Sequence, residues 1–151
     1  GIATDATIVE PLWSPDGTAY LEHMPGDWSN WVLHRADGAE IKTLPSPVMW
    51  GPWWSPDSRK ITFVVTTFPT STLEVFDVQG QERTDVTTTD NLGFWRQHGS
   101  PLSPDGELIA CTIEPASGEL IGQHRVVVYD MTGTERVRFE GWGLTSWRPQ
   151  Q

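Results

Sequence analysis

The sequence predicts an all-β fold assembled from repeated units of four short antiparallel strands. Three observations predict it: a Trp-Ser-Pro-Asp motif recurs, β-rich runs follow each copy in the same order, and no segment has a sustained helical period with caps. The motif begins at positions 13, 54 and 102, with a degraded copy at 147, so the spacings are 41, 48 and 45 residues. A repeat of this period indicates a stacked or radial architecture.

Each unit is expected to begin with an inner strand and a tight turn. In the Ser-Pro-Asp-Gly sequence, Pro sets φ, Asp bonds the local backbone and Gly accepts a positive φ. We therefore predict that the repeated aspartates are turn residues rather than metal or proton ligands, and that the anchor tryptophans pack between units. The structural anchors are Trp13, Asp16, Trp54, Asp57, Asp105 and Trp147, with Leu102 in place of the third tryptophan.

Three further runs follow each turn. The second strands are expected at 19–21, 61–65 and 108–113, and the third strands at 31–34, 73–76 and 126–129. Short outer strands follow a second turn at Gly38, Gly80 and Gly133. Four strands every 40 to 48 residues is the layout of a β-propeller blade. We predict one partial β-propeller over residues 1–151, with blades at about 8–49, 50–97 and 98–143 and a terminal closing strand at 144–149.

These repeats resemble a known family. The turn at 13–17, the apolar run and the strands Val75-Phe76-Asp77 and Val128-Tyr129-Asp130 are similar to the TolB-type β-propeller repeat. That repeat also occurs in the propeller domains of prolyl-oligopeptidase-like peptidases. The resemblance covers roughly residues 8–149, although the first blade has His34-Arg35 where the others have an aromatic residue and Asp. It implies a propeller fold and an extracytoplasmic location, periplasmic or secreted.

Ring closure is the open question that this fold raises. Propellers usually close with about four to eight blades, and three open blades would leave two faces exposed. We therefore interpret the chain as half of a six-bladed propeller. Two alternatives complete it: a second copy of the chain, as a homodimer, or a missing half of which this chain is the C-terminal continuation.

Composition excludes several classes of protein. The net charge of −10 argues against a nucleic-acid binder and against adsorption to anionic membranes. The single cysteine, Cys111, excludes an internal disulfide framework and is expected in the core. No stretch of 18 apolar residues predicts membrane insertion, and no signal peptide is recognised.

The sequence offers no catalytic constellation. It lacks a Gly-x-Ser-x-Gly nucleophile motif and a phosphate-binding glycine loop, and its four histidines have no metal-ligand spacing. His34 aligns with Phe76 and Tyr129, so it is expected to fill a packing position. We predict that the chain is not an enzyme and carries no metal or cofactor.

Tryptophan is the compositional outlier, with nine copies in 151 residues. Several lie in the links from an outer strand to the next inner strand, which in a propeller gather at one mouth of the central channel. An aromatic ring there could stack on a ligand, with polar neighbours for specificity. The alternative is that these side chains seal contacts between blades. The candidate ligand-binding residues are Trp50, Trp53, Trp95, Arg96, His98 and Trp142.

The predicted function is a non-catalytic binding or interaction module. It would complete its ring with a second copy or a missing half, and bind a protein, a peptide or a carbohydrate at the channel mouth. One alternative is a purely structural or assembly role. Another is an accessory propeller domain of a hydrolase or peptidase.

Overall fold

A computed structural model describes residues 10–24, 27–44, 48–67, 69–89, 92–93, 101–113 and 125–140. Twelve strands in these residues form three antiparallel four-stranded sheets, and no helix occurs among them. The first sheet has the order β1-β2-β3-β4, the second β5-β6-β7-β8 and the third β9-β10-β11-β12. The predicted all-β class with repeated antiparallel sheets is confirmed.

Each sheet is a meander of consecutive strands. The first consists of β1 (Leu12–Trp13), β2 (Ala19–Met24), β3 (Asp27–Arg35) and β4 (Glu40–Thr43). The second consists of β5 (Val48–Trp54), β6 (Lys60–Thr67), β7 (Thr70–Asp77) and β8 (Glu82–Thr89). The third consists of β9 (Leu92–Gly93), β10 (Leu108–Ile113), β11 (Arg125–Asp130) and β12 (Glu135–Glu140).

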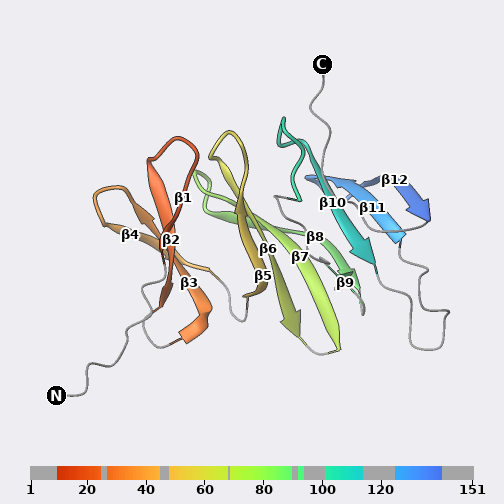
Figure 1. Cartoon of the computed structure of the whole chain (residues 1–151), viewed down its shortest axis with the longest axis horizontal. Coiled ribbons are helices and arrows are strands. Elements are labelled where there is room, and N and C mark those ends of the chain that lie inside the picture. The colour runs from red at the N-terminus through yellow and green to blue at the C-terminus, as the bar shows by residue number, and fades with distance from the viewer. Residues whose placement is uncertain are drawn as a thin grey trace.

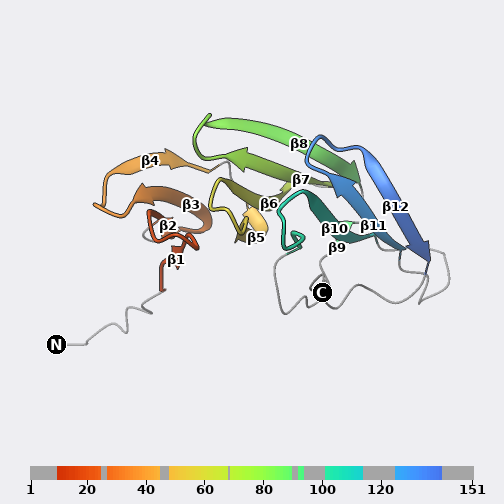
Figure 2. The ribbon, with the colours of Figure 1, turned by 90° about the horizontal axis from the view of Figure 1, so that it is seen from above.

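The three sheets stand side by side in an arc (Figure 2). The first strands of the sheets, β1, β5 and β9, lie along the inside of the arc, and the last strands, β4, β8 and β12, lie along its outside. The turns that join β1 to β2 and β5 to β6 lie on the same edge, at the top of Figure 1. This is the arrangement of neighbouring propeller blades.

Apolar side chains fill both spaces between neighbouring sheets, because alternate residues of a strand point to opposite faces. Along β6, for example, Ile61 and Phe63 belong to the cluster shared with the first sheet, whereas Val64 belongs to the cluster shared with the third. The central sheet is therefore buried on both faces. The first and third sheets each have one face that no described sheet covers.

The sheets divide the chain at slightly different points from those predicted. The second sheet begins at Val48, because the strand that carries Trp54 is longer than the motif suggests. The third sheet includes Leu92 and Gly93, which pair with Ile113 and Thr112 and lie within the range predicted for the second blade. The predicted closing strand at 144–149, with Trp147, lies outside the described residues.

Candidate functional site

The Ser-Pro-Asp turns are held by one repeated set of hydrogen bonds. In the first turn, Ser14 Oγ donates to Asp16 Oδ1 at 2.7 Å, and the same carboxylate oxygen accepts the Thr18 amide at 3.0 Å. The Ser14 amide also donates to the Ala19 carbonyl at 2.9 Å. The other two turns repeat these contacts with Ser55, Asp57, Arg59 and Lys60, and with Ser103, Asp105, Glu107 and Leu108.

These bonds also fix the charge of the three aspartates. The Thr18 amide and the Ser14 hydroxyl lower the pKa of Asp16 to about 2. The pKa values of Asp57 and Asp105 are lowered as well, chiefly by hydrogen bonds from the hydroxyls of Ser55 and Ser103. In each turn, Oδ1 of the carboxylate is committed to the turn that contains it. Within the described part of the chain, no group of three or more His, Cys, Asp and Glu side chains could hold a metal ion.

One side chain joins the first two turns directly. Ser58 has a φ of 61°, at the position where the other turns carry Gly17 and Gly106. Its Oγ accepts the Asp16 amide of the neighbouring sheet at 3.0 Å. The unusual φ therefore accompanies an interaction that glycine could not make.

The junction between the first and second sheets buries the anchor Trp54, which is 8% exposed. Its indole Nε1 donates to the Leu12 carbonyl of β1 at 3.0 Å, which ties the inner strands of two sheets together. Glu74 is buried at this junction, beside Phe63 in the strand register, and desolvation raises its pKa. The remaining buried residues of the cluster are Ala19, Leu21, Leu33, Leu44, Ile61 and Phe76.

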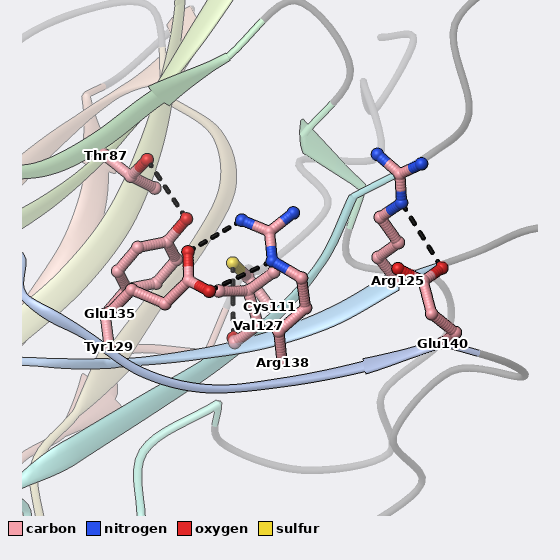
Figure 3. A network of polar contacts seen from close by, with 8 residues as sticks. All are labelled: Thr87, Cys111, Arg125, Val127, Tyr129, Glu135, Arg138 and Glu140. Carbon is pink, nitrogen blue, oxygen red and sulfur yellow. Dashed lines mark hydrogen bonds and ion pairs between the residues drawn. The ribbon is translucent and has the colours of Figure 1, made fainter.

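The junction between the second and third sheets is built at the equivalent positions. Tyr129 of β11 accepts a hydrogen bond from Thr87 of β8 at 3.4 Å (Figure 3). Cys111 is buried in this junction, and desolvation raises the pKa of its thiol to about 12. The other buried members are Val64, Leu73, Val75, Val86, Leu102, Ile109 and Val127.

The uncovered face of the first sheet carries an aromatic row. Trp13 lies 4.9 Å from Tyr20 between ring centroids, and Tyr20 stacks on His34 at 5.0 Å with an interplanar angle of 14°. His34 Nε2 lies 3.0 Å from Glu22 Oε1. Trp13 is 49% exposed, which differs from the expectation that every anchor tryptophan packs between blades. The physical reason is that no described sheet precedes the first one.

The outward face of the third sheet carries an exposed apolar row on its outer strand, whereas Ala110, Val126 and Val128 on the same face are buried. Val137 and Phe139 of β12 are 43% and 55% exposed, and they pair with Val128 and Val126 of β11. Neither residue was among the candidates predicted from the sequence. Their signal was present in the repeat, because Phe139, Leu44 and Val86 each lie four residues beyond the aligned glutamates Glu135, Glu40 and Glu82.

The predicted ligand residues are only partly placed. Trp53 is half-buried and packs against the cluster between the second and third sheets, so it serves a junction. Trp50 lies in β5, opposite Val64. The other four, Trp95, Arg96, His98 and Trp142, lie outside the described residues. The structure does not bring the six together, and ligand binding by them stays a prediction.

A cavity of about 520 Å³ lies between the outer turns of the second and third sheets. Lys60, Asp77, Glu82 and Met131 are among its lining residues, and none of the six candidate residues is. Asp77 Oδ1 accepts the Gly80 amide at 2.6 Å, so this carboxylate also serves its own turn. The residues that line the cavity carry charges of both signs, which indicates no particular ligand.

The structure resembles solved β-propellers. The β-propeller domain of the Trilobed protease from Pyrococcus furiosus matches with a TM-score of 0.61 and 14% identity, over 87% of this chain and 42% of that chain. The acylaminoacyl peptidase of Pyrococcus horikoshii matches with a TM-score of 0.61 and 15% identity, over 88% of this chain and 24% of that chain. A putative TolB from Agrobacterium tumefaciens matches with a TM-score of 0.52 and 24% identity, over 89% of this chain and 52% of that chain.

These likenesses show the fold alone, which is that of a β-propeller. This chain spans between about a quarter and about half of the length of the three proteins. No protein-family model matches the sequence, and no curated protein matches it. A search of the described residues finds no helix that is long and apolar enough to cross a membrane.

Proposed function

We propose that this chain is a non-catalytic propeller module that acts by binding, after its ring has been completed by further blades. The observation that carries the proposal is a difference in solvent exposure between residues at equivalent repeat positions, inside the arc and at its ends. Trp54 and Leu102 are 8% and 4% exposed because a preceding sheet covers them, whereas Trp13 at the same repeat position is 49% exposed. Trp13 adjoins Tyr20 on this face, and contiguous exposed patches of this kind, rather than single side chains, mark interfaces.

The other end of the arc supports the same conclusion. Leu44 and Val86 are 2% and 5% exposed beneath the following sheet, whereas Phe139 at the equivalent position is 55% exposed. Each end therefore exposes an aromatic residue whose counterparts are buried at the internal junctions, although Ala110, Val126 and Val128 on the outward face of the third sheet are buried as well. Three blades make half of a six-bladed ring, a size within the usual range for propellers.

The completed ring would present its channel mouth to a protein, a peptide or a carbohydrate. This part of the proposal comes from the sequence, because the aromatic and polar links at 93–98 and 141–143 would gather at one mouth. An extracytoplasmic location belongs to the same proposal and depends on the likeness to TolB.

Two other roles compete with ligand binding. One is a purely structural ring, in which the linking tryptophans only seal blades. The other is an accessory domain of a hydrolase, which is favoured by the two peptidases among the similar structures. The second role predicts a hydrolase domain in the full-length reading frame that contains this chain.

The experiment that tests binding compares the wild-type chain with Trp95→Ala and Trp142→Ala on peptide and glycan arrays. Thermal unfolding followed by circular dichroism is measured on the same samples. Under the binding proposal both variants fold and assemble as the wild type does, and ligand affinity falls about five- to 150-fold, since stacked aromatic contacts contribute roughly 1–3 kcal/mol. Variants that lose assembly or folding instead support the structural role.

A further inference from the structure

We propose that the outward face of the first sheet is a docking site for a basic side chain, Arg or Lys, of a partner polypeptide. The site consists of Trp13, Tyr20, Glu22 and His34, which are called the first-sheet patch below. The inference rests on the proposed function, in which this face is an interface, and it names the chemistry of what binds there.

The first-sheet patch differs in polarity from the face at the same place in the second sheet. That face is buried against the first sheet and consists of Trp54, Ile61, Phe63 and Phe76. The pairing is the same in both, because Tyr20 lies opposite His34 as Ile61 lies opposite Phe76. Tyr20, Glu22 and His34 thus place polar groups where the second sheet has hydrocarbon. An entirely apolar partner would bury these groups without compensation.

Two members of the patch are open to a partner. Trp13 is 49% exposed, and the side chain of Glu22 is 43% exposed. Val32, which lies opposite Glu22 on the same face, is buried. The proposed site is therefore the row that joins Trp13 to Glu22, and not the whole face of the sheet.

Glu22 can accept a hydrogen bond from a group outside the chain. Its Oε1 lies 3.0 Å from His34 Nε2, and His34 Nδ1 lies 3.3 Å from the Gly38 carbonyl oxygen. Both ring nitrogens face acceptors, although a neutral imidazole has one N–H to donate and no charge to balance the carboxylate. Among the described contacts, Glu22 uses Oε1 alone. Its Oε2 and its charge are therefore available to a cation.

The aromatic members of the patch favour a cation in the same place. The ring centroids of Trp13 and Tyr20 are 4.9 Å apart, with an interplanar angle of 46°, and Tyr20 stacks on His34. The faces of Trp and Tyr rings attract ammonium and guanidinium groups, and the alkyl stems of Lys and Arg pack on apolar surface. A carboxylate beside such rings therefore selects a basic side chain over a neutral one.

The chain already places a cation at the equivalent point of its first internal junction. Lys42 Nζ lies 5.5 Å from the centre of the Phe76 ring, and Phe76 is the counterpart of His34. Lys42 belongs to β4, the outer strand of the sheet that covers this ring. A partner that approaches the first sheet in the same way would bring its basic side chain over His34, beside Glu22. The net charge of −10 attracts such a partner as well.

The test titrates the isotope-labelled chain with three blocked pentapeptides and follows the Trp13 indole N–H and the Tyr20 and Glu22 amides by two-dimensional NMR. The peptides have the sequence Thr-Val-X-Val-Thr, in which X is arginine, citrulline or leucine. Citrulline keeps the shape of arginine without its charge. At about 150 mM salt, the arginine peptide is expected to shift these signals with a millimolar dissociation constant. The citrulline and leucine peptides should bind at least about fivefold more weakly.

Three variants locate the binding. Trp13→Ala should weaken the arginine peptide about two- to 30-fold, and Glu22→Gln about two- to fivefold, without changing binding of the leucine peptide. Glu107→Gln is the matched control, because it makes the same change of charge at an exposed residue of the third sheet's turn. It should bind as the wild type does. Circular dichroism confirms that all three variants are folded.

Four results overturn the proposal. They are equal affinity for the arginine and citrulline peptides, tighter binding of the leucine peptide, no shift at the Trp13 indole, and Glu107→Gln weakening the arginine peptide as much as Glu22→Gln does. The last would mean that only the net charge attracts the peptide.

These outcomes are separate from those of the array experiment. Array signals that depend on Trp95 and Trp142, without selective binding of the arginine peptide, refute the docking site but not the proposed function. Selective binding at Trp13 and Glu22 without any array ligand has the opposite meaning.

Discussion

Replacing Gly133 by alanine should destabilise the chain by more than the same change at Gly38. The two glycines occupy equivalent turns, with φ of 85° and 86°, and each amide donates to the residue three positions earlier. They differ in their surroundings. A Cβ at Gly133 would lie 2.5 Å from the Val86 carbonyl oxygen of the second sheet, whereas a Cβ at Gly38 would have nothing within 4 Å.

The magnitude follows from separating two costs. A left-handed alanine costs about 1–2 kcal/mol at either position, since its Cβ approaches the neighbouring carbonyl. At Gly133 the turn must also move away from β8, and overpacking of this kind costs about 1–3 kcal/mol. We expect losses of about 1–2 kcal/mol for Gly38→Ala and about 2–5 kcal/mol for Gly133→Ala.

Urea unfolding at constant protein concentration measures both variants in the same assay. Hydrogen exchange should show faster exchange in β11 and β12 for Gly133→Ala, since the turn that docks them on the second sheet is displaced. Equal losses within about 0.5 kcal/mol would refute the reasoning. They would mean that the third sheet does not rest on Val86 as the geometry requires.

Four further predictions concern single groups. Trp54→Phe should lower the free energy of unfolding by about 1 kcal/mol through loss of the bond to the Leu12 carbonyl, and an unchanged urea midpoint would contradict that role. The pKa of Asp16 is lower in the folded than in the unfolded chain, so Asp16 stabilises the fold at pH values above its unfolded pKa, and this stability is lost as the pH falls from about 4 towards 2. Asp16→Asn should therefore flatten this part of a pH titration of the urea midpoint. The raised pKa of Glu74 has the opposite effect, because stability falls as the pH rises above the pKa of this carboxyl in the unfolded chain. Glu74→Gln should therefore raise the urea midpoint at pH 7 more than at pH 4. The buried Cys111 should react with a thiol reagent only as fast as the third sheet opens, and rapid labelling at pH 8 would show that this junction is loose.

The turns were predictable from the sequence because their interactions are local. The side chains of Ser14 and Asp16 bond to groups within five residues, so the motif contains nearly all of the information that forms the turn. The same reasoning located the three sheets. The outer turn of the second sheet departs from the pattern, because Gln81 rather than Gly80 has a positive φ there.

The end faces were not predictable in the same way. The motif does not reveal whether Trp13 is covered, because exposure depends on which sheet lies beside it. The orientation of Trp53 towards the third sheet depends likewise on the register of β5 with β6, which shifts between Trp50 and Trp53. Aligning the repeats recovers part of this information, since it identifies Phe139 as the counterpart of two buried residues.

The strand order has a consequence for how such a chain folds and evolves. Every strand pairing in the described residues joins consecutive strands, so each sheet can form from its own 40 or so residues before it meets another. Local pairing of this kind lowers the entropy that must be lost before contacts form and speeds folding. It also means that a gene segment encoding one unit can be duplicated or deleted without changing any ladder partner. The number of blades on one chain, and how many chains share a ring, can then change independently of the sheet itself.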